Sequence, residues 1–161
     1  MPTKIYLASP FGFSEAGRVF MYGNIIPIIE NAGYEVLDPW KLTSQDLIQP
    51  VAQMPYGPEK RDKWRALNKI IGGNNAQAIR ECDGIVAILD GVDVDSGTAS
   101  EIGFATALEK PIIGYRGDFR LSADNEGSTV NLQVQYFIES HGGKVITQLD
   151  DLEPLLKTVF R

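Results

Sequence analysis

The stretch G-I-V-A-I-L at residues 84–89 decides the fold of this chain. It is a continuous apolar run of strand length, and Asp90-Gly91 ends it. Such runs are typical of a strand that helices cover on both faces of a parallel sheet. We therefore expect residues 84–89 to form a central strand.

Strand and helix patterns alternate on both sides of this run. Short apolar or β-branched runs predict strands at residues 4–8, 34–37, 84–89, 111–115 and 144–146. Periodic patterns predict helices at residues 13–31, 58–82, 98–108, 130–140 and 152–160. Residues 41–57 have no clear period, which predicts a long functional loop or lid. Crossovers of this length require parallel strands. The chain is thus predicted to be one α/β domain over residues 1–161, a doubly wound five-stranded parallel sheet with helices on both faces.

Composition narrows the class of protein. The 161 residues are 43% hydrophobic and 22% charged, the balance of a soluble globular protein. The net charge is −6 and no lysine or arginine cluster stands out, which argues against nucleic acid or an anionic membrane as the main partner. Cys82 is the single cysteine, so no internal disulfide can form. Neither a signal-peptide pattern nor an apolar run of ~20 residues occurs, and we expect a cytoplasmic protein.

Polar and aromatic residues follow the first and third predicted strands. Tyr6, Ser9 and Phe11 lie at the end of the first strand, and Asp95 and Glu101 follow the third. Ligands in doubly wound folds bind at the carboxyl ends of the strands. Because these two strands are neighbours in the usual orders, we expect the five residues to meet in one cleft. Phe11 and Trp40 either stack on a planar ligand there or serve as packing.

The stretch D-S-G-T-A-S-E-I-G at residues 95–103 allows two interpretations of Glu101. A helix that begins at Thr98 places Glu101 in its first turn, where the helix dipole favours the carboxylate by about 0.3–1 kcal/mol. Glu101 is then ready to act as a nucleophile or base, and small residues such as Gly97 let a ligand approach the backbone. Alternatively, Thr98 and Glu101 form a capping box, and Glu101 only caps the helix.

Several cofactor motifs are absent. The sequence contains neither G-x-G-x-x-G nor G-x-x-x-x-G-K-[ST], the fingerprints of dinucleotide and P-loop sites. No cysteine and histidine cluster suggests zinc. We expect a protein that uses neither a metal nor an organic cofactor.

Four segments together resemble the nucleoside 2-deoxyribosyltransferase family. They are K-I-Y-L-A-S-P at residues 4–10, C-D-G-I-V-A-I-L-D-G at 82–91, D-S-G-T-A-S-E-I-G-F-A at 95–105 and K-P-I-I at 110–113. The resemblance implies a flavodoxin-like α/β fold. It also implies an enzyme that exchanges the base of a 2′-deoxynucleoside for another free nucleobase.

The resemblance implies a role for each matching residue. Glu101 is the nucleophile that attacks C1′ of the deoxyribose, and Tyr6 orients it. Asp95 binds the sugar near its 5′-hydroxyl. Asn131 reaches the same sugar across a subunit interface, which requires a homodimer or a higher homo-oligomer.

One position departs from the family pattern. Asn75 stands where the family usually has an aspartate that handles the leaving base. An amide can hydrogen-bond the base but cannot protonate it. The proton then comes from Asp95, from a water or from a carboxylate in residues 41–57.

Two other functions stay open. A related hydrolase cleaves 2′-deoxynucleoside 5′-monophosphates with water; Ser9, Ser96 and Arg18 favour a phosphate, whereas Asp95 would repel it. A non-catalytic nucleotide-binding domain would keep the cleft without needing Glu101.

Overall fold

The computed structural model describes residues 2–160 and contains one five-stranded parallel sheet. Its strands lie in the order β2-β1-β3-β4-β5. Their bounds are β1 (Lys4–Ala8), β2 (Glu35–Leu37), β3 (Gly84–Ile88), β4 (Ile112–Tyr115) and β5 (Lys144–Ile146). Tyr6 of β1 pairs with Leu37 on one side and Ile85 on the other. The predicted parallel sheet, with the run at 84–88 in its centre, is confirmed.

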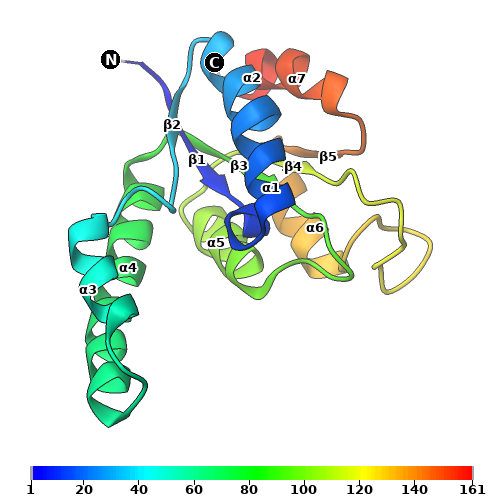
Figure 1. The fold of residues 1–161 in the computed structure, drawn as a ribbon. Coiled ribbons are helices and arrows are strands. Elements are labelled where there is room, and N and C mark those ends of the chain that lie inside the picture. Colours follow the sequence, from blue (N-terminus) through cyan, green and yellow to red (C-terminus); the bar gives the residue numbers. More distant parts are fainter. Residues whose placement is uncertain (1, 161) are drawn as a thin grey trace.

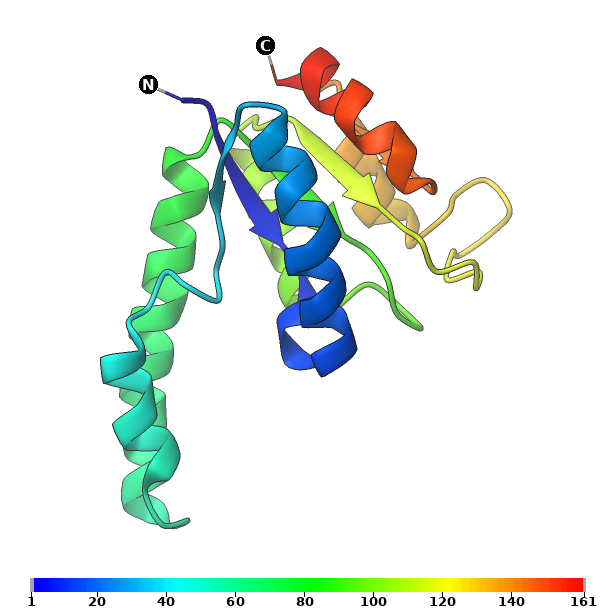
Figure 2. The same ribbon diagram turned by 45° about the horizontal axis from the view of Figure 1, so that its top comes forward.

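Helices cover both faces of the sheet (Figures 1 and 2). One face carries α1 (Glu15–Phe20), α2 (Ile26–Asn31) and α7 (Leu152–Val159). The other carries α4 (Pro58–Glu81), α5 (Ser96–Ala107) and α6 (Leu132–Glu139). Every residue of β3 is buried because both of its faces are covered. Of the described residues, no helix combines the length and apolar character that a membrane crossing needs.

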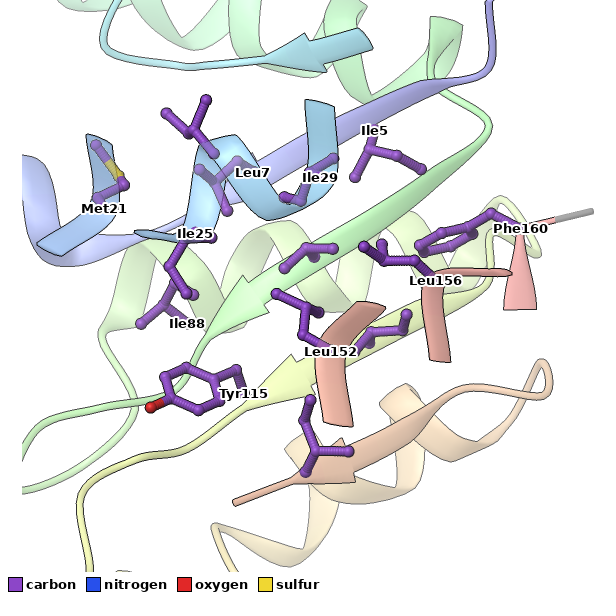
Figure 3. Packing of buried hydrophobic residues seen from close by; sticks show 14 residues of the cluster. Ile5, Leu7, Met21, Ile25, Ile29, Ile88, Tyr115, Leu152, Leu156 and Phe160 are labelled. Carbon is purple, nitrogen blue, oxygen red and sulfur yellow. The ribbon is translucent and has the colours of Figure 1, made fainter. Parts of the chain in front are cut away.

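The core on the first face is built from aliphatic side chains of the strands and of the three helices (Figure 3). The sheet contributes Ile5, Leu7 and Ile88 to this core. Their side chains point toward Ile25, which lies between α1 and α2, and toward Leu156 of α7. All five are fully buried, so this packing adds to the parallel pairing that holds β1 and β3 side by side.

The predicted helix at residues 13–31 is divided into several turns. A 3₁₀ turn, η1 (Pro10–Phe13), precedes α1, and Ser14 caps α1 by accepting a hydrogen bond from the Gly17 N–H at 3.0 Å. A π turn, η2 (Met21–Ile25), then separates α1 from α2. The break falls just before Pro27, which lacks the N–H that a continuous helix requires.

Residues 41–57 are not a structureless loop, contrary to the prediction. They contain a further helix, α3 (Gln45–Gln53), and Ser44 caps it by accepting from the Asp46 N–H at 3.2 Å. Ile48 and Val51 are half-buried on a short helix that packs against α4. Pro50 inside α3 obscured this pattern, because proline normally ends a helix. Figures 1 and 2 show α3 and the first half of α4 projecting together from the body as a helical arm.

Candidate active site

A hydrogen bond between Tyr6 and Glu101 forms the centre of the candidate site. The Tyr6 hydroxyl donates to Glu101 Oε1 at 2.6 Å, across 95 positions of sequence. Tyr6 lies on β1, and Glu101 lies on α5, which follows the neighbouring strand β3. Pairing of the first and third strands therefore brings the two side chains together, as the cleft prediction required.

Glu101 does not cap its helix. Helix α5 begins at Ser96, and its N-cap is Asp95, whose Oδ2 accepts from the Thr98 N–H at 3.0 Å. Glu101 consequently lies in the second turn, and the prediction of a first-turn position after a start at Thr98 is wrong. The capping-box interpretation is wrong as well, because the Glu101 carboxylate bonds to Tyr6 instead.

The environment of Glu101 weakens its acidity. Burial raises the pKa of this carboxyl to about 7, the neighbouring Asp95 charge adds to the rise, and the Tyr6 hydrogen bond opposes it. The expectation that the helix dipole keeps Glu101 fully ionised is therefore corrected: at neutral pH the protonated and ionised forms coexist. Burial and the Glu101 charge raise the pKa of Tyr6 far above its ordinary value, so its hydroxyl remains a proton donor in the hydrogen bond.

Glu101 opens onto a cavity of about 390 Å³ at the carboxyl ends of β1 and β3. Six of the predicted site residues line it, namely Ser9, Trp40, Asn75, Asp95, Gly97 and Glu101. Phe13, Pro39, Asn68, Ile71 and Thr98 complete the lining. Within these lining residues there is no lysine, arginine or histidine, so the fixed charges of the wall are carboxylates.

An aromatic pair forms one part of the cavity wall. The Trp40 Nε1–H donates to the Ser9 carbonyl at 3.3 Å, and the Phe13 ring meets the Trp40 ring edge-on with 4.7 Å between centroids. A Cβ on Gly12 would fall 1.9 Å from a Trp40 ring carbon, so only glycine lets the indole lie there. Phe13 is nevertheless 74% exposed, which leaves most of its ring free to contact a ligand.

Phe11 does not line the cavity. Its ring packs edge-on against Phe20, with centroids 5.9 Å apart, and adjoins the core on the first face. The packing interpretation holds for Phe11, and the aromatic side chain at the cavity is Phe13. The two residues are two positions apart, and the 3₁₀ turn η1 turns the second of them outward. No sequence pattern distinguishes them.

Helix α4 supplies the polar amides of the cavity. Asn68, Ile71 and Asn75 follow one another at intervals of three and four residues, which places them on one face of the helix. This spacing was the signal that would have added Asn68 and Ile71 to the predicted site. The neighbouring Asn74 faces elsewhere and donates to Thr43 Oγ1 at 3.0 Å, which ties α4 to the segment before α3.

Asn131 does not line the cavity of its own chain. It is the N-cap of α6, and its Oδ1 accepts from the Gln133 and Val134 N–H groups at 3.0 and 3.3 Å. Its predicted contact with the sugar of another subunit stays a prediction.

Two further segments lie away from the cavity. Asp46, the carboxylate in residues 41–57, is exposed in the first turn of α3 and does not line the cavity, so this source of a proton is dropped. Phe160 packs against Gly84 at the amino end of β3, the edge of the sheet opposite the cavity.

Comparison with known proteins establishes the family. A family model described as nucleoside 2-deoxyribosyltransferase matches residues 5–133 of the 161. The chain belongs to the nucleoside 2-deoxyribosyltransferase family. Tyr6, Asp95, Glu101 and Asn131 all fall inside the matched segment.

Solved structures share the family fold. A conserved protein from Enterococcus faecalis V583 superposes with a TM-score of 0.74 at 23% identity, covering 98% of this chain and 99% of that one. The 2-deoxyribosyltransferase from Bacillus psychrosaccharolyticus gives 0.65 at 24%, covering 94% and 90%. A CMP N-glycosidase from Clostridium botulinum gives 0.54 at 21%, covering 97% and 98%. A search of curated protein sequences finds no significant match. At these identities the solved structures establish the fold alone.

Proposed function

We propose that this family member transfers the 2-deoxyribosyl group between nucleobases. The observation that carries the proposal is the Glu101 carboxyl group, hydrogen-bonded to the buried Tyr6 at 2.6 Å and lining a 390 Å³ cavity. A carboxylate held in one orientation by a hydroxyl donor is suited to nucleophilic attack on a sugar carbon.

The reaction proceeds in two displacements. The ionised Glu101 carboxylate attacks C1′ of the 2′-deoxynucleoside, and the bond from C1′ to the base breaks with its electron pair leaving on the base. The sugar is then an ester of Glu101. A nitrogen of the second base attacks C1′ and releases Glu101, and the N–H proton of that base returns to the group that protonated the first base. The two displacements retain the anomeric configuration. Asp95 holds the sugar hydroxyl, and the negative wall stabilises the oxocarbenium-like transition state.

The departing base gains its proton from Asp95 or from a water in the cavity. Asn75 lines the base side in this arrangement, and its amide carries no acidic proton to give. Trp40 and Phe13 offer their rings to the planar base.

The lining of the cavity favours a nucleoside over a nucleotide. A 5′-phosphate carries negative charge, and the cavity presents two carboxylates and no cationic side chain among its lining residues. Arg18 donates to the Gly12 carbonyl at 3.1 Å and does not line the cavity. Hydrolysis of 5′-monophosphates, the second candidate, therefore has less support than transfer between nucleosides.

Product analysis tests the proposal. Purified protein is incubated with deoxyadenosine, alone and with a second free base, and products are followed by chromatography. Base-dependent formation of the second nucleoside is expected. Release of free deoxyribose regardless of the second base, or activity on the monophosphate alone, would favour the hydrolase, and absence of any turnover would favour a binding domain. Glu101→Gln is the inactive control, matched by Glu59→Gln at the exposed first turn of α4.

A further inference from the structure

Asp38 is a buried carboxylate that the proposed mechanism does not use. It lies directly after β2, is 6% exposed and has no ion-pair partner among residues 2–160. Its Oδ1 accepts from the Trp40 backbone N–H at 3.0 Å, and its Oδ2 accepts from the Tyr22 hydroxyl at 2.8 Å. Asp38 does not line the cavity, whereas Trp40 does. Asp38 can therefore act on a ligand in the cavity through Trp40.

Residues 38–41 form a tight turn with Trp40 at its third position. The Lys41 N–H donates to the Asp38 carbonyl at 2.9 Å, and the Asp38 side chain closes the turn through the Trp40 N–H. Aspartate at the first position and proline at the second favour such a turn, because the short carboxylate reaches the backbone two residues on and Pro39 fixes φ. Asp38 thus sets the backbone conformation from which the indole of Trp40 projects.

Tyr22 holds the other oxygen of the carboxylate. It lies in the π turn η2, a kind of irregularity that is frequent at functional sites. Burial and the hydrogen bond to Asp38 raise the pKa of the Tyr22 hydroxyl to about 12, so this group remains a donor at neutral pH. Lys41 Nζ lies over the Tyr22 ring, 4.6 Å from its centroid. Tyr22 therefore connects the turn to the helical run that follows β1.

The indole of Trp40 is fixed at its far end as well. Its Nε1–H donates to the Ser9 carbonyl at 3.3 Å, and Gly12 leaves room for the ring. An aromatic ring that is already held in place binds a planar ligand more tightly, because less free energy is spent on ordering the ring. Asp38 fixes the backbone end of Trp40, and Ser9 fixes the ring end.

We propose that Asp38, held by Tyr22, is a positioning residue that presents the ring of Trp40 to a planar ligand in the cavity. Asparagine at position 38 would make the same two contacts, since its oxygen accepts from the Trp40 N–H and its amide donates to the Tyr22 oxygen. A side chain without an acceptor would leave the Trp40 N–H unpaired and loosen the turn. The nature of the ligand, a nucleobase, rests on the proposed function.

Fluorescence tests the placement of Trp40 without any turnover. The chain contains two tryptophans, so Trp64→Phe leaves Trp40 as the single emitting indole. In this background we expect Asp38→Ala to shift the emission to longer wavelength and to increase quenching by acrylamide, because the ring becomes more accessible to water. Asp38→Asn should retain the parent emission. Circular dichroism verifies that each variant is folded.

Initial-rate kinetics test the consequence for the ligand. Asp38→Ala should raise the KM for deoxyadenosine about 2- to 10-fold, the loss of one aromatic contact. The kcat should change less than KM, because the hydrogen bond between Tyr6 and Glu101 is untouched. Asp38→Asn should restore the parent KM.

Two tyrosine variants serve as a matched pair. Tyr22→Phe keeps the ring but removes the donor to Asp38, so it should move emission and KM in the same direction as Asp38→Ala, by a smaller amount. Tyr34→Phe also removes a hydroxyl donor, here one that bonds to the carbonyls of Leu156 and Phe160 on the other side of the molecule from the cavity. It should leave both readouts unchanged.

The outcomes separate this inference from the proposed function. An unchanged emission in Asp38→Ala, the same emission shift in Asp38→Asn, or an equal rise of KM in Tyr34→Phe would each overturn the role of Asp38. Base exchange by the parent protein without the dependence of Trp40 emission on Asp38 would leave the proposed function standing and remove the inference. That dependence without base exchange, together with adenine binding that Asp38→Ala weakens, would do the reverse.

Discussion

Glu101 combines two properties that oppose each other at the scale of a single residue. In the proposed mechanism its burial beside the cavity makes the carboxylate reactive, and the same burial makes the ionised form costly to the folded state. The Tyr6 hydrogen bond recovers part of that cost and keeps one carboxylate oxygen oriented. Stability and activity therefore respond to pH in opposite directions.

Replacing Glu101 with glutamine should expose this conflict. The pKa is about 7 in the folded protein against an ordinary 4.5, so between these values the folded state binds more protons than the unfolded state. Stability of the native protein therefore falls as pH rises through this window and levels off above it. Glu101→Gln cannot ionise, so it should be more stable than the parent by about 1–3 kcal/mol above pH ~7.5 and no more stable near pH ~4.5. Urea denaturation at both pH values measures this, and equal curves at the higher pH would contradict the raised pKa.

Activity should show the complementary pH dependence. In the proposed mechanism only ionised Glu101 attacks C1′, so we expect kcat/KM to rise with pH through about 7. Tyr6→Phe removes the hydrogen bond that lowers the Glu101 pKa, so the rise should move to higher pH and the rate at neutral pH should fall. Initial rates across the pH range measure both effects. An unshifted profile in the variant would show that Tyr6 does not act on the ionisation of Glu101.

At the scale of the element, Asp95 has two positions at once, as the N-cap of α5 and as part of the cavity wall. It caps α5 through the Thr98 N–H and also lines the cavity, so one side chain both starts the helix and faces the cavity. The sequence-based start at Thr98 missed this because serine, threonine and aspartate are all good N-caps, and three of them lie within residues 95–98. The choice of Asp95 moved Glu101 from the first turn to the second, out of capping range.

Two substitutions should separate the roles of Asp95. Asp95→Ala removes the cap and is expected to destabilise the protein by about 0.5–2 kcal/mol. Asp95→Ser retains a competent cap, so its stability should remain within about 0.5 kcal/mol of the parent while the KM for deoxyadenosine rises. Chemical denaturation and initial-rate kinetics on both variants measure the two effects. An unchanged KM in Asp95→Ser would assign Asp95 to the helix alone.

Helix α4 shows that local sequence patterns can predict the bounds of an element. Its predicted extent, residues 58–82, agrees with Pro58–Glu81 to within one residue, and the helix is continuous through Gly72 and Gly73. A Cβ at either glycine would meet nothing within 4 Å, so packing does not require glycine there. The apolar contacts of Leu67, Ala78 and Ile79 on either side of the pair maintain the helix.

At the scale of the whole molecule, Asn131 raises the question of a partner subunit. The chain's own Asn131 caps α6 and lies outside the cavity, so contact with the sugar requires a second copy. Mixing two variants tests this. Asn131→Ser keeps a capping hydroxyl but shortens the side chain, and Glu101→Gln removes the proposed nucleophile.

Each variant alone should have little activity. The mixture is unfolded and refolded so that subunits reassemble at random and about half of the dimers are mixed. If Asn131 acts across a two-fold interface, one of the two sites in each mixed dimer is intact, or about a quarter of all sites. We therefore expect the mixture to recover about a quarter of the parent rate. No recovery after verified subunit exchange would mean that Asn131 does not serve the site of another chain.

The fold and the positions of most cavity residues were predictable because they depend on local signals. The apolar run at residues 84–89 and the alternation of periods around it determined a parallel sheet, and the rule that ligands bind at its carboxyl edge pointed to Tyr6 and Glu101. The orientation of Phe13 in place of Phe11 and the helix inside residues 41–57 depend on packing between distant segments. No local pattern encodes them.

The sequence by itself determined the succession of the five strands and of the helices other than α3, the family motifs and the two residues at the centre of the candidate site. Only the tertiary structure decided their chemistry. Tyr6 and Glu101 are 95 positions apart, and their 2.6 Å hydrogen bond exists because β1 and β3 lie side by side. The pKa of Glu101 near 7 arises from burial by that same packing and from the nearby charge of Asp95, and both are properties of the folded molecule.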